Sequence, residues 1–139
     1  MTVVAATPAD ADEVVALWAA CGLTRPWNDP HADFRLALGG AASAVLVVRE
    51  GAAIVGSVMV GFDGHRGWVY YLAVAPDARR GGIGRALMAA AADWLRAAGA
   101  PKLQLMVRGG NAAVLDFYAA LGLERQDVVV LGRFLSEVG

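Results

Sequence analysis

The stretch from Leu72 to Arg85 is the part of the sequence best suited to carry chemistry. An apolar run is followed by a short turn and then by several arginines and glycines, in the order LAVAPDARRGGIGR. A helix that begins after such a turn presents unpaired backbone amides and the positive end of its dipole, both of which attract phosphate. Glycines allow close approach of the backbone, and Arg79 and Arg80 add positive charge. The stretch therefore predicts a pyrophosphate-binding site.

Other glycine-rich phosphate motifs fit this stretch poorly. Gly82 and Gly84 lack the third glycine of the dinucleotide fingerprint, because Leu87 stands there, and no Gly-Lys-Ser/Thr follows. The alternative to a phosphate site is a helix start in which the glycines only turn the chain and the arginines are solvated. The residues of this stretch alone leave both interpretations open.

Caps, prolines and glycines predict the elements that must position this stretch. The predicted helices cover residues 7–21, 29–38, 82–98 and 111–121. The predicted strands cover residues 44–49, 52–62, 68–75, 102–107 and 128–135. The run 68–75 is apolar without alternation, as is typical of a central strand covered on both faces. The sequence predicts an α/β (α+β) fold, and we expect one domain over residues 1–139.

Composition excludes several classes of function. Among 139 residues the formal net charge is −1, so no global field would draw the protein to nucleic acid or to an anionic membrane. No stretch stays apolar for the roughly 18–20 residues that a membrane span needs. We expect a cytoplasmic protein with no metal, nucleic-acid or membrane partner. The single cysteine, Cys21, is interpreted as a small buried hydrophobic residue rather than a nucleophile.

Two motifs, taken in order, resemble a known family. Arg79-x-x-Gly82-x-Gly84 after an apolar strand resembles the acyl-CoA pyrophosphate motif of the GNAT superfamily of N-acetyltransferases. Asn111, Tyr118 and Gly122-Leu123 are similar to that family's Asn…Tyr…Gly-Phe helix, with Leu123 in place of the usual aromatic residue. Residues 25–30 and 63–67 resemble the YpeA-type bacterial branch. The similarity spans nearly the whole chain.

The resemblance implies a fold and a cosubstrate, acetyl-CoA. The expected fold is the GNAT fold, a mixed, twisted sheet with helices on both faces. Its two middle strands, here 68–75 and 102–107, splay apart to admit pantetheine. By the same resemblance, the backbone N–H of Leu72 faces the thioester carbonyl and that of Val74 faces the pantetheine arm. The other residues expected to bind the cosubstrate are Arg79, Arg80, Gly81, Gly82, Ile83, Gly84, Arg85, Asn111 and Tyr118.

Acetyl transfer from a thioester to an amine needs a neutral nucleophile, an oxyanion site and a proton for the departing thiolate. The expected catalytic groups are the Leu72 amide and, as proton donor, Tyr118. Tyr118 could equally belong to a core stripe with Val114, Phe117 and Leu121, which share its helix face. Neither middle strand contains Asp or Glu. The base is therefore either ordered water or a loop residue, with Asp63, His65 and Asp29 as candidates.

The expected acceptor is an amine. In relatives of the family, the segments that border the acceptor correspond to those that contain Trp27, Asn28, Asp29 and Phe62. The loop residues Asp63 and His65 are expected at the same site. Aromatic and acidic side chains suit a small cationic amine or a peptide amino terminus. We expect the protein to be a monomer or a homodimer.

Three functions remain in competition at this level. The leading hypothesis is an acetyl-CoA-dependent N-acetyltransferase. The absence of a carboxylate on the middle strands motivates a second, a non-catalytic acyl-CoA-binding sensor. The third is a nucleotide-binding module, which would prefer ATP or NAD to CoA.

Overall fold

The structure is a computed structural model that describes residues 1–108 and 110–137. The chain forms two compact units, Met1–Met106 and Val107–Gly139, and each is described by itself. Among the described residues, the first unit contains the five-stranded sheet and three α-helices, whereas the second contains one α-helix and the C-terminal segment.

The first unit is built on a five-stranded mixed sheet with the order β1-β2-β3-β4-β5. The strands are β1 Val3–Ala5, β2 Ser43–Glu50, β3 Ala53–Phe62, β4 Gly67–Val74 and β5 Leu103–Leu105. Neighbouring strands from β1 to β4 are antiparallel, and β4 and β5 are parallel. The predicted strands 44–49, 52–62, 68–75 and 102–107 are thus confirmed as β2 to β5, although β5 is shorter than predicted, and β1 was not predicted.

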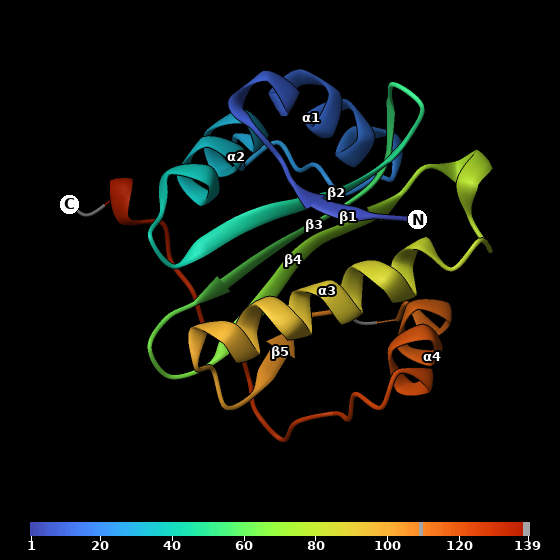
Figure 1. Ribbon diagram of the computed structural model, residues 1–139. Coiled ribbons are helices and arrows are strands. Elements are labelled where there is room, and N and C mark those ends of the chain that lie inside the picture. Colours follow the sequence, from blue (N-terminus) through green and yellow to red (C-terminus); the bar gives the residue numbers. More distant parts are fainter. Residues whose placement is uncertain (109, 138–139) are drawn as a thin grey trace. The chain divides into compact units, whose positions relative to one another are not determined.

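Helices cover both faces of this sheet, as predicted. Helices α1 (Ala11–Ala20) and α2 (Pro30–Gly39) lie on one face, and α3 (Ile83–Ala98) lies on the other (Figure 1). Local signals define their ends. The Asp29 carboxylate accepts the Ala32 N–H at the start of α2, at 3.1 Å, and Gly99 ends α3 in the left-handed region at φ 90°.

Two glycines allow α3 to lie close to the sheet. A Cβ added at Gly56 would stand 2.6 Å from Cγ2 of Ile83, and one added at Gly67 would stand 2.6 Å from Cδ1 of Leu95. Both distances are shorter than van der Waals contact, so a larger residue at either position would push the helix away. At the beginning of α3, Ile83 packs on Gly56 of β3, which pairs with Val74, so the helix begins beside the end of the strand that leads into it.

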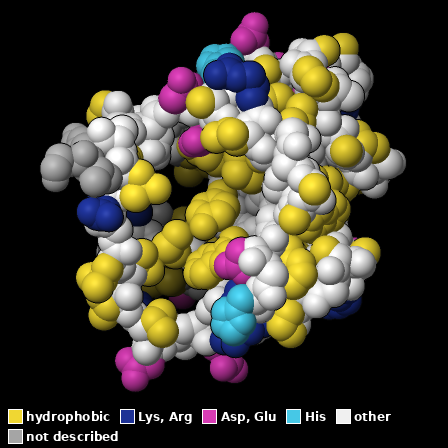
Figure 2. Space-filling view, turned by 90° about the vertical axis from the view of Figure 1, so that its left-hand side faces the viewer, with side chains coloured by type: hydrophobic (Ala, Val, Ile, Leu, Met, Phe, Trp, Pro, Cys, Tyr) yellow, Lys and Arg dark blue, Asp and Glu magenta, His cyan; other side chains and the backbone are white. Residues whose placement is uncertain are grey.

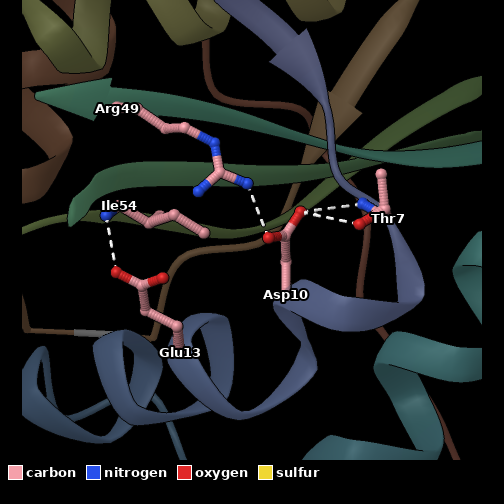
Figure 3. A network of polar contacts seen from close by, with 5 residues as sticks. All are labelled: Thr7, Asp10, Glu13, Arg49 and Ile54. Atoms are coloured by element: carbon pink, nitrogen blue, oxygen red, sulfur yellow. Dashed lines mark hydrogen bonds and ion pairs between the residues drawn. The ribbon is translucent and has the colours of Figure 1, made fainter. Parts of the chain in front are cut away.

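A polar network anchors α1 to the β2–β3 hairpin on the other face (Figure 3). The Asp10 carboxylate accepts the Thr7 backbone N–H at 2.9 Å and pairs with the Arg49 guanidinium. The Glu13 carboxylate accepts the Ile54 N–H at 2.7 Å. The bond from the Thr7 N–H, followed by the contact with Arg49, holds the pKa of Asp10 below its ordinary value.

Replacing Asp10 with Asn should destabilise the protein by about 1–3 kcal/mol at neutral pH, because it weakens hydrogen bonds to a charged group. The folded-state pKa lies below the unfolded value near 3.9, so the ionised carboxylate stabilises the fold above that pH. This stabilisation is lost as the pH falls through the folded-state pKa. Urea denaturation of both proteins from pH 7 to pH 3 should show the difference shrinking with acid. A difference that does not change with pH would contradict the assignment.

The second unit contains α4 (Ala112–Ala120), whose first turn is capped by Asn111 as predicted. The Asn111 side-chain oxygen accepts the Val114 N–H at 3.3 Å. The predicted strand over 128–135 is wrong, because residues 128–134 have no regular structure and a 3-10 turn follows at Leu135–Glu137. Val and Phe favour strands, but a strand also requires a partner for its backbone groups, and that requirement overrides local preference.

Candidate active site

A β-bulge interrupts β4 near its carboxyl end. Met59 of β3 pairs with Tyr70, and Ser57 pairs with Ala73. A single residue of β3 therefore stands opposite two residues of β4, Tyr71 and Leu72. Tyr71 adopts φ 53°, a left-handed conformation that is uncommon for a non-glycine residue. Bulges of this kind bend a strand and change the direction of its side chains and amides.

Beyond the bulge, β4 has a backbone edge that faces away from β3. The ladder between β4 and β5 runs only from the pair Gly67–Leu103 to the pair Val69–Leu105. The Ala75 N–H donates to the Val55 carbonyl of β3 at 2.8 Å. Because successive amides of a strand point to opposite edges, the amides of Val74 and Leu72 point away from β3. These are the two amides that the family resemblance selects.

The chain then turns directly into the beginning of α3. The N-cap of the helix is Gly82, which adopts φ 81° and has no side chain to bond the first helical amides. Arg80 is also left-handed, at φ 73°, so the turn is sharp. Arg79 is exposed, and its Nε donates to the Val74 carbonyl at 3.2 Å. The arrangement combines orphan amides, a dipole end and several arginines, which is a favourable environment for phosphate.

The Cys21 thiol contacts the same strand end. Its Sγ lies 3.3 Å from the Val74 carbonyl, to which it donates, and 3.8 Å from an Arg79 guanidinium nitrogen. Cys21 is partly buried and packs against the core cluster beneath α1. These contacts are consistent with the packing role expected for this residue.

An aromatic and polar cluster supports the bulge from the α1–α2 face. The ring of Tyr71 stacks on the buried Trp18 with centroids 3.8 Å apart and an interplanar angle of 7°. The Tyr71 hydroxyl donates to the Asp33 carboxylate at 2.8 Å, and the Trp18 indole N–H donates to Ser57 Oγ at 2.9 Å. Burial, followed by the bond to Asp33, raises the pKa of Tyr71, so its hydroxyl stays protonated.

Replacing Tyr71 with Phe should destabilise the protein by about 1 kcal/mol, because it removes the bond to Asp33 and keeps the ring stacked on Trp18. Urea denaturation measures the loss. In a double-mutant cycle with Asp33→Asn, the two losses should not add, since both variants break the same bond. Additive losses would show that the hydroxyl and the carboxylate act independently.

A pocket of about 500 Å³ opens at the other end of β4. Its lining includes Ser43, Gly61, Phe62, Asp63, Trp68 and Tyr70. The structure thus brings Phe62 and Asp63, two of the predicted acceptor residues, to one pocket. It does not bring the others there: Trp27 is 55% exposed on its loop, Asn28 is exposed, and Asp29 caps α2.

Asp63 and His65, the loop candidates for the base, differ in their surroundings. One Asp63 oxygen accepts the backbone N–H groups of His65 and Arg66 at 2.8 and 2.7 Å, and the other accepts the Trp68 indole N–H at 3.2 Å. The two backbone bonds hold the pKa of Asp63 below its ordinary value, which makes the carboxylate a weak base near neutral pH. His65 is exposed in the turn.

Tyr118, the predicted proton donor, lies in α4 of the second unit. Its ring contacts that of Phe117 edge to face, with centroids 5.1 Å apart. Burial raises the pKa of Tyr118 above its ordinary value, so the phenol is protonated throughout the neutral range. A protonated phenol can donate a hydrogen bond or a proton.

Sequence reasoning missed four residues of this region: Asp33, Trp68, Tyr70 and Tyr71. The two tyrosines directly precede Leu72, and this adjacency was the available signal. Their different surroundings arise from the bulge.

Among the residues that the structure describes, no group of three or more His, Cys, Asp or Glu side chains is placed to hold a metal ion.

Mixed-sheet topology, a bulged central strand and an open helix start define the class as an acyl-CoA N-acyltransferase fold. The model of the GNAT acetyltransferase family matches residues 12–123. An acetyltransferase of Sodalis glossinidius, SG1711, is 47% identical over 129 residues, which cover 92% of this chain and 91% of that protein. The chain belongs to the GNAT family and is an acetyl-CoA-dependent acyltransferase.

Solved structures share this fold. An aminoglycoside N-acetyltransferase, AAC(6')-Iy, in complex with CoA superimposes with a TM-score of 0.82 at 17% identity, covering 96% of this chain and 94% of the other. A ribosomal-protein-alanine N-acetyltransferase from Brucella melitensis has a TM-score of 0.76 at 23% identity, covering 96% and 99%. At these identities the likeness concerns the fold.

In the described part of this chain, no helix has the length and apolar character needed to cross a membrane.

Proposed function

We propose that the protein transfers the acetyl group of acetyl-CoA to a primary amine, by direct attack of the amine and through a tetrahedral intermediate. The observation that carries the proposal is one continuous stretch, from Leu72 to Arg85. It contains a bulged strand whose ladder with β5 ends at Val69, a sharp turn and an open helix start. A strand edge suits an extended amide-containing arm, and a helix start suits a pyrophosphate.

The side chains of this stretch fit the cosubstrate. The first amides of α3 have no capping side chain at Gly82, and Arg79, Arg80 and Arg85 are exposed around them. These residues would hold the pyrophosphate. The backbone edge at Leu72 and Val74 would hold the pantetheine arm. Asn111 and Tyr118 of α4 are assigned to the same cosubstrate by the family resemblance alone. Acetyl-CoA supplies the activated acetyl group.

The residues of the chain then have separate roles in the transfer. The Leu72 N–H would donate to the thioester oxygen as it gains negative charge, a contribution typically worth a few kcal/mol. Tyr118 would give its proton to the departing thiolate. Because Asp63 is a weak base and the middle strands carry no carboxylate, we assign removal of the amine proton to ordered water.

A primary amine is the acceptor class that agrees with the relatives. The two solved neighbours are named for transfer to an aminoglycoside and to a ribosomal-protein alanine. Both names denote N-acetyl transfer, although to very different molecules. The pocket near Asp63 contains aromatic and anionic groups and no Lys or Arg among its lining residues, which suits an amine.

Release of CoA thiol in the presence of a panel of amines tests the proposal against the sensor hypothesis. Amine-dependent release is the expected result. If acetyl-CoA bound but no amine in the panel caused release, the sensor would be favoured. A calorimetric preference for ATP or NAD over CoA would instead favour a nucleotide-binding module.

A further inference from the structure

The pocket at the start of β4 is built to hold a positive charge. Trp68 and Tyr70 alternate along the strand and so share one face, with ring centroids 6.5 Å apart and an interplanar angle of 22°. The Asp63 carboxylate lies against this pair, fixed to the Trp68 indole N–H. Aromatic faces beside a carboxylate attract cations such as ammonium groups.

The charges around the pocket agree with this role. The backbone N–H groups of Arg66 and His65 lower the pKa of Asp63, so its carboxylate stays ionised. Burial first, and then the negative charge of Asp63, raises the pKa of Tyr70. The Arg66 side chain of the turn donates to the His65 carbonyl at 3.0 Å, and His65 lies close enough to Asp63 to contribute to its lowered pKa. Figure 2 shows basic and acidic side chains interspersed on the face that it draws. Because neither sign of charge dominates this face, attraction of a cation depends on the groups that line the pocket.

The pocket lies on the same face of the sheet as the aromatic and polar cluster that supports the bulge. In the β3–β4 register, Trp68 stands opposite Gly61 and Tyr70 stands opposite Met59. Met59 and Tyr71 both pack against the core cluster beneath α1 and α2. Tyr70 and Trp68 precede Leu72 by two and four residues, which corresponds to about 7–13 Å of strand. One small molecule can therefore reach from the pocket to the Leu72 amide.

The reacting amine cannot be the group that the pocket holds. Attack on a thioester requires a neutral amine, whereas an ionised carboxylate beside two aromatic rings favours the protonated form. The pocket must then bind a charge that does not react. This step rests on the proposed function, because it takes the Leu72 amide as the place of reaction.

We propose that the acceptor is a small molecule with at least two amino groups, a diamine or polyamine. One ammonium group binds between Asp63, Trp68 and Tyr70, and a second, neutral amino group attacks the acetyl carbonyl near Leu72. The new bond joins that nitrogen to the acetyl carbon, the carbon–sulfur bond breaks, and the amine proton leaves through water. The thiolate takes a proton from Tyr118.

Binding of choline, compared with its neutral analogue 3,3-dimethylbutanol, tests the pocket without any transfer. The two probes have nearly the same shape and differ in charge. Choline should shift the NMR signal of the Trp68 indole and bind at least about tenfold more tightly than the alcohol. In Trp68→Leu and in Asp63→Asn, which keeps the turn's acceptor oxygen, this preference should fall severalfold. Equal binding of the two probes, or a preference unchanged in both variants, would overturn the proposal.

Pairs of straight-chain monoamines and diamines of the same length test the substrate class. We expect kcat/KM to be at least about tenfold higher for the diamine, and this advantage to fall in Asp63→Asn. Equal values, or a peptide amino terminus preferred to every diamine, would overturn the proposal while leaving acetyl transfer intact. Choline binding at Trp68 without acetylation of any amine would contradict the proposed function and leave the cation site in place.

Discussion

Tyr118→Phe is expected to bind acetyl-CoA nearly as the wild type does and to turn over at least tenfold more slowly. The substitution keeps the ring that contacts Phe117 and removes only the hydroxyl. Burial keeps that hydroxyl protonated at neutral pH, and general acid catalysis typically contributes about 10²–10⁴-fold. Steady-state kinetics with a good acceptor, together with calorimetry of acetyl-CoA, measure the two effects.

The acidity of the leaving group is the control for this prediction. If Tyr118 protonates the thiolate, the defect should shrink with acyl donors whose thiols are more acidic, because these thiols leave without a proton. A defect that is independent of thiol acidity would indicate that the hydroxyl positions the substrate. Loss of stability with normal turnover per folded molecule would make Tyr118 a core residue.

Loss of phosphate contacts at the start of α3 should have the second large effect. Arg79→Ala should raise the dissociation constant of acetyl-CoA about ten- to a hundredfold, since hydrogen bonds to charged groups contribute about 1.5–3 kcal/mol. Gly84→Val should weaken binding by a similar factor, because a branched side chain stands where the backbone would approach the pyrophosphate. Calorimetry measures both constants.

Arg96→Ala is a matched control for Arg79→Ala. Arg96 is exposed in the last turn of the same helix, where it pairs with Asp93. Arg96→Ala and Arg79→Ala each remove one positive charge, so the two variants have the same net charge. Its acetyl-CoA affinity should equal that of the wild type. Equal affinity for acetyl-CoA in the wild type, Arg79→Ala and Gly84→Val would contradict the assignment of a phosphate site to this turn.

The elements that sequence analysis predicted correctly have local causes. Asp29 caps α2, Asn111 caps α4, and Gly99 ends α3, each through contacts within a few residues. The predicted strand over 128–135 failed because a strand depends on a partner elsewhere in the chain, whereas the residues themselves only show a preference.

The candidate site also combines features that depend on neighbouring residues with features that depend on distant parts of the chain. The stretch from Leu72 to Arg85 is contiguous, so its motif could be read directly. The bond between Tyr71 and Asp33 joins positions 38 residues apart and depends on the bulge. The pocket around Trp68 likewise depends on the register of β2, β3 and β4. Local pattern does not predict a bulge or a register, so these residues became visible only in the folded structure.

Product analysis with acetyl-CoA labelled with ¹³C in the acetyl group tests the central claim most directly. The protein is incubated with the labelled donor and a diamine, and NMR and mass spectrometry identify the molecule that carries the label. We predict a labelled N-acetyl amide of the diamine, formed in the same amount as free CoA thiol. Label that stays in the thioester, or appears only as free acetate, both with the diamine and with every other amine of the panel would contradict acetyl transfer to an amine.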